Sequence, residues 1–373
     1  MLKQIVHIVK ITGIHGTEKH LLDLLPGLTR DYRLTVILLA EPGCPMDNYI
    51  AALHGHAIET YRINIRRDMD PRCFVQLYSL LKKMQPALVH THLIHGDLYG
   101  ITAARLAGIR TIVSTKHNDD TFRKNAVLNL LNRFVNKRLN RAIAISHWIK
   151  AFICDVEKMP PDRIETIHYG LPAPPAPNNP AAVRTELGYS PELLVLGIIA
   201  RLVEQKGHSC LIEAFAEAHA RNPRIRLLIV GDGPLNSTLK DLVRMHQLSG
   251  VIRFTGYRTD ITELLAAIDI FIHPSLWEGF GLAILEAMAA AKPIISSRVS
   301  AIPELIEDRV SGLLVPPGSS SELAQAITRL CSDSNLRSDL GLNAARRWQE
   351  HFSLEPMVRK TGAFYESILK TQE

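Results

Sequence analysis

The sequence has few of the residues that build disulfide-bonded or zinc-bound small domains. Its five cysteines are scattered, odd in number and never spaced as CxxC. That usage is typical of a reducing compartment, and it argues against a disulfide framework and against a zinc site. No run of 18 apolar residues occurs, so the sequence predicts no membrane-spanning helix. We therefore expect a protein of the cytoplasm.

The first residues predict a strand rather than an export signal. The stretch MLKQIVHIVKITG lacks both the long apolar segment and the small-residue cleavage site of a signal peptide.

At 373 residues the chain is too long for one ordinary core, so two domains are expected. Its 46% apolar and 21% charged residues leave no room for a large disordered region.

Positive charge is concentrated in the first half of the chain. Residues 1–170 hold 23 Lys and Arg against 15 Asp and Glu, whereas the remainder holds 20 against 22. Because charge imbalance bears on partners rather than on fold, the first half is expected to face something anionic. A phosphorylated acceptor, a membrane surface and nucleic acid are the three alternatives at this point.

Short apolar stretches alternate with amphipathic helical stretches from end to end. Helical patterns such as 17–30 and 97–107 separate the strand candidates of the first half. These candidates are QIVHIVKI, RLTVILLA, AIETYRI, ALVHTHL, TIVSTKH, RAIAIS and RIETIHYG. The alternation predicts βαβ units and a parallel sheet, with connecting loops at the carboxyl ends of the strands.

A proline-rich stretch divides the chain. PAPPAPNNP, at 172–180, has five prolines in nine residues and cannot lie inside a sheet or a helix. The same alternation resumes after it. We therefore predict an α/β protein with two Rossmann-like domains, 1–171 and 186–354, joined by a linker over 172–185. In such sheets ligands bind at the carboxyl ends of strands, and between two domains that means an interdomain cleft.

The stretch WEGFGLAILEAMA has the strongest ligand-binding pattern. Gly279 and Gly281 let the backbone approach a ligand closely, and the helix that follows favours an anion such as phosphate at its start. Glu286 lies five residues beyond Gly281, a rise of about 7.5 Å, which is roughly the span from a nucleotide's diphosphate to its ribose. Glu278 precedes the helix, on the sugar side of the phosphates. The alternative is a surface Glu before a helix and an ion-paired Glu inside it.

Two further stretches supply cations and a glycine turn. ARLVEQKG follows a strand and places Arg201 and Lys206 in a loop, where two cations can neutralise a diphosphate leaving group. Taken alone, such side chains are more often solvated charges. VGDGP matches only the start of a dinucleotide fingerprint, because Asn236 stands where a third glycine is needed. The same shortfall argues against an NAD dehydrogenase.

Together these stretches resemble the family-four retaining glycosyltransferases of the GT-B fold. The similar segments of the second half are ARLVEQKG, VGDGP, RFTGY, AIDIFIHPS, EGFGLAILE with its E-x7-E spacing, and SGLLVPPG. Those of the first half are GTEKHLLDL, VHTHLIHGDLYGITAARLAGI and VSTKHN. The resemblance covers nearly the whole chain. It is specific for the family and unspecific for the substrate.

The resemblance implies roles for matching residues in a donor site. Arg201 and Lys206 would hold the donor diphosphate, Glu286 would bind the ribose, and Tyr257 would lie near the base. Glu278 would hold the sugar and phosphates together with three backbone groups, those of Phe280, Gly281 and Leu282.

The first half adds two residues by the same resemblance. Gly16 matches a loop that approaches the phosphate or sugar, although the family often has two adjacent glycines where this chain has His15 and Gly16. His117 matches a histidine near the donor sugar and the acceptor. From its residue type it would orient or hydrogen-bond the reacting groups, whereas a bare histidine at a strand end is more often structural. A C-terminal helix near 355–373 would pack back on the first domain.

No metal or cofactor is expected. His90, His92 and His95 lie close in sequence, but no carboxylate or cysteine completes a ligand set. The nucleotide-sugar is a substrate, and its diphosphate would be neutralised by cationic side chains and a helix start.

The DxD sequence at 68–70 is the metal motif of a different glycosyltransferase fold. Because Asp70 precedes Pro71 and a helical pattern, an N-cap followed by a proline explains it better.

The stretch 121–141 predicts a helix with one basic stripe. Arg133, Lys137 and Arg141 are spaced four residues apart. They lie opposite an apolar side formed by Val127, Leu131, Phe134 and Leu139. An interfacial or acceptor-phosphate role and a plain solvated face are the alternatives.

We predict a metal-independent enzyme that transfers a hexose from a UDP- or GDP-sugar to an acceptor hydroxyl with retention of configuration. The family points to cell-envelope glycan or glycolipid synthesis, with a lipid-linked or phosphorylated acceptor and no nucleic acid. Peripheral contact of the basic first domain with the inner face of the membrane is left open. A nucleotide-sugar epimerase on the same scaffold and a non-enzymatic small-ligand receptor are the alternatives. An epimerase would yield no transferred product, and a receptor would lack even slow donor hydrolysis.

Overall fold

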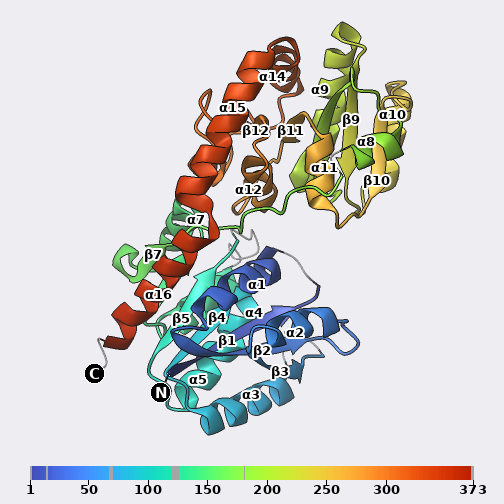
Figure 1. Ribbon diagram of the computed structural model, residues 1–373. Helices are drawn as coiled ribbons and strands as arrows, with labels where there is room; N and C mark the ends of the chain where they lie inside the picture. Colours follow the sequence, from blue (N-terminus) through green and yellow to red (C-terminus); the bar gives the residue numbers. More distant parts are fainter. Residues whose placement is uncertain (1, 14–15, 67–69, 119–125, 180, 371–373) are drawn as a thin grey trace. The chain divides into compact units, whose positions relative to one another are not determined.

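The computed structural model shows two compact α/β units (Figure 1). The first comprises Met1–Pro172 and Leu354–Glu373, and the second comprises Ala173–Ser353. The structure describes residues 2–13, 16–66, 70–118, 126–179 and 181–370. Each unit contains a parallel sheet, which confirms the predicted α/β class with two Rossmann-like sheets.

The first unit has a seven-stranded sheet in the order β3-β2-β1-β4-β5-β6-β7. Its strands follow the predicted apolar stretches: β1 (Lys3–Ile11), β2 (Tyr32–Ala40), β3 (Glu59–Asn64), β4 (Leu88–His92), β5 (Ile112–Lys116), β6 (Arg141–Ala144) and β7 (Ile164–Thr166). The central strands are buried almost throughout, as expected of a parallel sheet covered on both faces. Strand order reverses between β1 and β4, the place where open sheets of this kind bind ligands.

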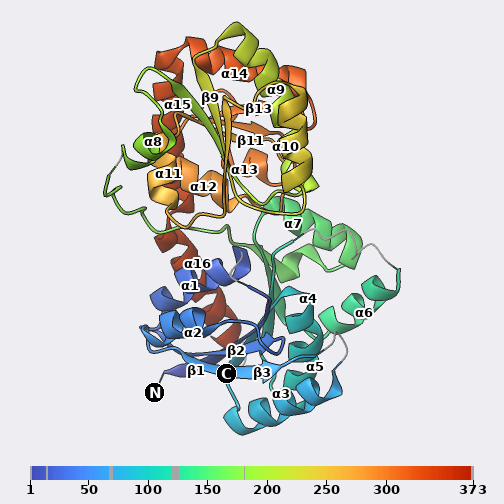
Figure 2. The same ribbon diagram turned by 90° about the vertical axis from the view of Figure 1, so that its right-hand side faces the viewer.

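Helices cover both faces of this sheet (Figures 1 and 2). One face carries α1 (Gly16–Leu28), α2 (Asp47–His54) and the C-terminal α16 (Leu354–Lys370). The other carries α3 (Pro71–Met84), α5 (Thr102–Leu106) and α6 (Ala126–Asn136), and shorter helices are α4 (Leu93–His95) and α7 (His147–Phe152). Helix α16 packs on α1: a Cβ at Gly27 would lie 2.7 Å from Val358. The C-terminal helix therefore belongs to the first unit.

Two predicted helices of this unit differ in detail from the structure. The stretch 97–107 begins with a π-helical segment, Gly96–Ile101, before α5. A Cβ at Gly96 would lie 2.8 Å from the Ile8 carbonyl oxygen, so a glycine is needed where this segment packs against β1. Helix α3 begins as predicted, with Asp70 accepting a hydrogen bond from the Arg72 N–H at 3.0 Å. Residues 68 and 69 lie outside the described residues.

The helix predicted over 121–141 is wrong at its C-terminal end. Helix α6 stops at Asn136, and Arg141 is the first residue of β6, where it pairs with Glu165 at 2.6 Å. The chain turns over 137–140 because Leu139 is buried there as part of the core. Residues 121–125 lie outside the described residues. The stripe is thus reduced to Arg133 and Lys137, both exposed.

The second unit has a six-stranded sheet in the order β10-β9-β8-β11-β12-β13. The strands are β8 (Leu194–Ile199), β9 (Ile225–Val230), β10 (Ile252–Gly256), β11 (Ile270–His273), β12 (Ile294–Ser297) and β13 (Leu313–Val315). The helices are α8 (Ala182–Leu187), α9 (His208–Arg221), α10 (Asn236–Met245), α11 (Ile261–Ala267), α12 (Leu282–Ala289), α13 (Ile302–Leu305), α14 (Ser320–Ser332) and α15 (Ser334–Arg347). Strand order reverses between β8 and β11.

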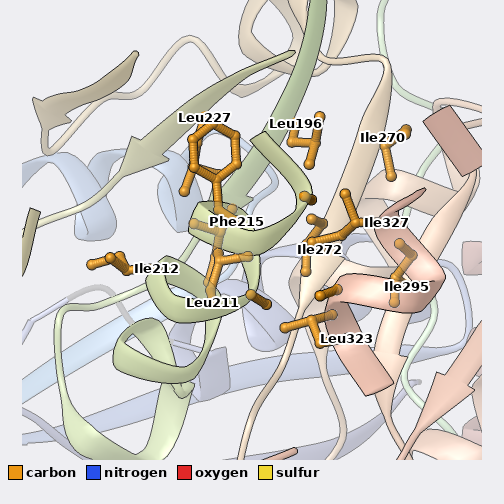
Figure 3. Close-up of a cluster of buried hydrophobic side chains, with 14 of the residues drawn as sticks. Leu196, Leu211, Ile212, Phe215, Leu227, Ile270, Ile272, Ile295, Leu323 and Ile327 are labelled. Carbon is orange, nitrogen blue, oxygen red and sulfur yellow. The ribbon is translucent and has the colours of Figure 1, made fainter. Parts of the chain in front are cut away.

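The core of the second unit lies between its sheet and helices α9 and α14 (Figure 3). Phe215 of α9 and Leu323 of α14 are fully buried, as are Leu227 and Ile272 of the strands. Burial of each such side chain contributes roughly 1.5–3 kcal/mol to folding. Helix α8 begins inside the stretch predicted as a linker. Its Arg184 joins this unit through an ion pair with Asp269 at 2.5 Å.

Candidate functional site

In the second unit, predicted site residues gather on loops that follow β8 and β11. Arg201 comes two residues after β8 and is exposed, and Lys206 ends a short turn before α9. Glu278 lies five residues beyond the end of β11. Because β8 and β11 are neighbours where the strand order reverses, both loops emerge at the edge of the sheet that usually binds ligands.

The structure brings Lys206 and Glu278 into direct contact. The Lys206 ammonium forms an ion pair with Oε2 of Glu278, which is only 9% exposed. The Nε2 atom of His273 lies 3.1 Å from the same carboxylate oxygen, and the Ser275 hydroxyl lies 3.0 Å from Nε2. The Glu278 N–H donates to the Ser300 hydroxyl at 3.3 Å. The result is a buried, hydrogen-bonded cluster of one carboxylate, one ammonium and one imidazole.

The cluster keeps Glu278 ionised. Burial by itself would raise the pKa of this carboxyl group, but the charge of Lys206 and the hydrogen bond from His273 outweigh burial and lower the pKa to about 2. Burial lowers the pKa of His273, against the opposing effect of Glu278. At neutral pH the pair is therefore a carboxylate beside a neutral imidazole. A carboxylate with so low a pKa is a poor proton acceptor, which favours an electrostatic or hydrogen-bonding role.

Glycine lets the two loops approach each other closely. Gly207 has φ +66°, and a Cβ there would lie 2.0 Å from the Pro274 carbonyl oxygen. The Leu276 N–H donates to the Gln205 carbonyl at 2.8 Å, and the Gln205 side chain donates to the Trp277 carbonyl at 3.0 Å. These two hydrogen bonds, one between backbone groups and one from a side chain, hold the loops that carry Lys206 and Glu278 together.

The VGDGP turn has a packing explanation. Gly231 has φ +130°, and a Cβ there would lie 2.0 Å from the Ala200 carbonyl oxygen. Gly233 approaches the Leu202 backbone in the same way, with its Cβ position 2.6 Å from the carbonyl oxygen. Both glycines thus let this turn pack on the loop that carries Arg201.

The other predicted donor residues surround the start of α12 or lie on the next loop. Gly281 is the N-cap of α12 with φ +104°, Leu282 is the first helical residue, and Glu286 is half-buried in the second turn. The Phe280 side chain is buried against Phe352, with ring centroids 6.2 Å apart, so its backbone is the part available to a ligand. Tyr257 follows β10 and is 79% exposed.

In the first unit, Gly16 begins α1 and His117 follows β5. His15 lies outside the described residues. His117 is buried, and both of its ring nitrogens have partners: Nε2 lies 3.1 Å from Nδ1 of His92, and Nδ1 contacts the Tyr169 hydroxyl. Tyr169 also hydrogen-bonds Thr17, the residue after Gly16. One phenol thus connects the two predicted positions of this unit.

Sequence reasoning misplaced the histidine cluster. His7 of β1 lies with His90 and His92, and all three are buried with ring nitrogens within 4.8 Å of one another. His95 lies apart from these three and contacts Lys10 at 3.4 Å. The cluster forms because His7 and His90 are register partners on adjacent strands.

Four side chains that contact the predicted site residues or the loops that carry them were not predicted from the sequence: Gln205, His273, Ser275 and Tyr169. His273 and Ser275 lie directly after a predicted strand, in FIHPS, and that position was a usable signal. Gln205 and Tyr169 meet their partners through contacts between residues distant in the sequence, and no local sequence pattern indicates those contacts.

Among the residues that the structure describes, no helix combines the length and the apolar character needed to cross a membrane.

Two family descriptions match the chain. Glycosyltransferase Family 4 matches residues 14–173, and Glycosyl transferases group 1 matches residues 183–347. The matched regions fall one in each unit.

Curated relatives match most of the chain. The chain is 29% identical to the UDP-Gal:alpha-D-GlcNAc-diphosphoundecaprenol alpha-1,3-galactosyltransferase of Escherichia coli, over 95% of this chain and 94% of the relative. It is 28% identical to the N-acetyl-alpha-D-glucosaminyl L-malate synthase of Bacillus anthracis, over 76% and 75% respectively.

Solved structures share the fold. Anabaena Alr3699/HepE in complex with UDP and glucose superposes with a TM-score of 0.86 at 21% identity, over 98% of this chain and 100% of that one. Sucrose-phosphate synthase from Thermosynechococcus elongatus gives 0.83 at 20% identity, over 99% and 100%. Both units and both family matches lead to one conclusion: the chain belongs to the family-four glycosyltransferases and has the GT-B fold.

Proposed function

We propose that the protein is a retaining glycosyltransferase that uses a nucleoside diphosphate sugar as donor. The Lys206–Glu278 pair carries this proposal, because it places an ammonium and a carboxylate together between the loops after β8 and β11. A cation there suits a diphosphate, and an ionised carboxylate suits sugar hydroxyls. UDP is the first nucleotide to test, since the E. coli relative is named for UDP-Gal and the Anabaena protein was solved with UDP.

In the proposed reaction, the bond from the anomeric carbon to the diphosphate oxygen breaks and a bond to the acceptor oxygen forms. The acceptor proton leaves with the nucleoside diphosphate. Lys206, Arg201 and the backbone N–H groups at the start of α12 would stabilise the charge that develops on the leaving group. Glu278 would hold Lys206 in place and orient the sugar, while Glu286 would bind the ribose. Orientation of donor and acceptor supplies the remaining acceleration.

Metal independence is part of the proposal. In this proposal Arg201, Lys206 and the start of α12 would neutralise the leaving diphosphate in place of a divalent cation. Transfer by purified protein should therefore survive EDTA. Complete loss of transfer that returns with added Mg²⁺ or Mn²⁺ would overturn metal independence. It would favour a metal-binding role for the DxD sequence at 68–70.

The acceptor we propose is a lipid-linked diphosphate sugar. The E. coli relative, similar along nearly the whole chain, is named for an acceptor of this kind, and the net positive charge of residues 1–170 suits an anionic acceptor. We also propose that α6 touches the membrane surface that presents it. Leu130 is 69% exposed and Phe134 is 56% exposed, close to the exposed Arg133 and Lys137. Exposed apolar side chains beside cations are typical of an interfacial helix.

A transfer assay tests the proposal. The full-length protein is incubated with a set of UDP- and GDP-hexoses and with a short-chain prenyl diphosphate-linked N-acetylglucosamine. We expect release of one nucleoside diphosphate and a glycolipid whose new bond keeps the donor's α configuration, as read by NMR. A β-linked product would overturn retention. An epimerised nucleotide sugar without transfer would favour the epimerase, and binding without turnover would favour a receptor.

A further inference from the structure

A chain of three buried imidazoles runs through the first unit and ends at His117. Nδ1 of His7 lies 3.0 Å from Nε2 of His92, and Nδ1 of His92 lies 3.1 Å from Nε2 of His117. Nδ1 of His117 contacts the Tyr169 hydroxyl. The three side chains come from β1, from the end of β4 and from the loop after β5. They are at most 3% exposed.

The hydrogen-bonding pattern allows only two proton arrangements when the rings are neutral. Each neutral imidazole has one N–H and one acceptor nitrogen. The bond between His7 and His92 therefore fixes which nitrogen of His92 carries hydrogen, and His92 in turn fixes His117. All three rings carry hydrogen on Nδ1, or all three carry it on Nε2. Burial lowers the pKa values of His7 and His92, which keeps these rings neutral.

The surroundings of His7, at one end of the imidazole chain, select one of these two proton arrangements. Nε2 of His7 is buried and has no hydrogen-bond partner among the described residues. Hydrogen on Nε2 would leave a buried N–H without an acceptor, which is rarer than an unused lone pair. The Nδ1–H form avoids that cost. In this form His7 donates to His92, His92 donates to His117, and His117 donates to the Tyr169 oxygen.

The same contacts argue against a metal ion in this cluster. Although His7, His90 and His92 have ring nitrogens within 4.8 Å of one another, the nitrogens of His90 lie 2.6 Å from the Tyr365 hydroxyl and 2.7 Å from the Thr115 hydroxyl. Both ring nitrogens of His92 form hydrogen bonds as well, to His7 and to His117. Of the ring nitrogens of these three histidines, Nε2 of His7 remains without a hydrogen-bond partner among the described residues. One such nitrogen is too few for a metal site.

We propose that His92 is a positioning residue, which holds the His117 ring in one tautomer and one orientation through the chain that runs from His7 to Tyr169. Which nitrogen of a histidine carries the proton is set by the hydrogen bond that the other nitrogen makes. The chain also reaches α1 through the bond between Tyr169 and Thr17. Its effect on catalysis rests on the proposed function, together with the place near the donor sugar and the acceptor that the family resemblance implies for His117.

The first test is spectroscopic and needs no substrate. The full-length protein is labelled with ¹⁵N-histidine, and long-range ¹H–¹⁵N spectra report the tautomer of each ring. Single substitutions assign the signals among the sixteen histidines. We expect the Nδ1–H tautomer for His7, His92 and His117, and a shift of His117 toward a tautomer mixture in His92→Phe. Mixed tautomers within the native chain, or metal retained by purified protein at one ion per chain, would overturn the proposal.

The matched control is His90→Phe. His90 lies on the same strand and is equally buried, and its two ring hydrogen bonds go to the hydroxyl groups of Tyr365 and Thr115, outside the imidazole chain. Its ring packs against that of His92, with centroids 4.3 Å apart, and phenylalanine keeps a ring in this place. This variant should leave the His117 tautomer and kcat unchanged. If His92→Phe does not fold, Tyr169→Phe replaces it. Loss of the hydroxyl at the other end of the chain removes the acceptor for His117 with little change in volume, and should shift the same signals. An unchanged His117 tautomer would overturn the proposal.

The second test is kinetic. His92→Phe should lower kcat roughly tenfold to hundredfold with little change in donor KM, as when a group that orients a functional histidine is lost. The His92→Phe/His117→Phe double variant should match His117→Phe within about twofold, because His92 acts through His117. Additive losses would overturn this role. A protein with native tautomers and no transfer with any donor would instead count against the proposed function alone.

Discussion

At Glu278, burial and ion pairing act in opposite directions on a single carboxyl group. Desolvation favours the neutral acid, but Lys206 and His273 lower its pKa to about 2. The folded protein therefore contains a carboxylate that is ionised across the physiological range. The charge of Lys206 is balanced by Glu278, so a change at either residue alters the field that a bound diphosphate would meet.

Glu278→Gln and Glu286→Gln should fail in different ways. Glu278→Gln frees the Lys206 charge, so UDP should bind as tightly as before or more tightly, while kcat falls roughly hundredfold because an interaction with the reacting sugar is lost. Glu286→Gln should weaken UDP and UDP-sugar alike, by about 1.5–3 kcal/mol, because a charged acceptor of the ribose hydroxyls is removed.

Calorimetric titration with UDP, combined with steady-state kinetics, separates these two outcomes. Equal loss of UDP affinity in both variants would show that the carboxylates do not lie at opposite ends of the donor.

At the scale of elements, the site depends on how closely the loops after β8 and β11 approach. Gly207→Ala should destabilise the protein by about 1–3 kcal/mol, because φ +66° strains alanine and its Cβ would meet the Pro274 carbonyl at 2.0 Å. Gly250→Ala is the matched control, since an added Cβ there has nothing within 4 Å. Chemical denaturation of both variants measures the difference. Equal stability of the two would mean that this backbone contact does not constrain the loops.

Helix α6 is the element that we expect to bind membranes. A Leu130→Ser/Phe134→Ser variant should sediment less with vesicles containing phosphatidylglycerol, because the exposed apolar contact is lost. Leu106→Ser, on α5, is the control, since Leu106 is similarly exposed, at 62%. Unchanged sedimentation of the α6 variant, or equal loss in the control, would show that α6 is an ordinary solvated helix.

At the scale of the whole molecule, the sequence predicts most of the fold and part of the site. Strands such as β1 and β9 are rich in β-branched and other apolar residues, so their positions follow from local pattern. The end of α6 does not, because buried Leu139 continues the helical period while lying in a turn. The contact between Lys206 and Glu278 joins residues 72 apart, and the pairing of His7 with His92 depends on strand order. Such long-range contacts have no local pattern.

The first unit should lose stability in mild acid. Burial lowers the pKa of His7 and His20 to about 3 from 6.5, and lowers those of His90 and His92 as well. Below pH 6.5 the unfolded chain binds protons that the folded chain does not. Stability is therefore complete above pH 6.5 and falls as pH decreases, by up to about 1.4 kcal/mol per pH unit for each histidine.

Urea denaturation between pH 7.5 and 4.5 measures this slope. His90→Phe should reduce the slope of unfolding free energy against pH by the contribution of one histidine. Thr115→Val removes a hydrogen-bond partner of His90 but keeps all four histidines, so it should leave the slope unchanged. Constant stability over this range would show that the histidines are not buried as neutral rings.

The most direct test of the central claim is donor consumption in EDTA by the wild type and by Lys206→Met. The full-length protein is incubated with UDP-hexoses and the prenyl diphosphate-linked acceptor, and UDP and glycolipid are quantified together. We predict equal amounts of UDP and α-linked product for the wild type, and at least a tenfold lower rate for Lys206→Met, because the leaving diphosphate loses a cation. Release of UMP in place of UDP, or an unchanged rate in Lys206→Met, would contradict the account.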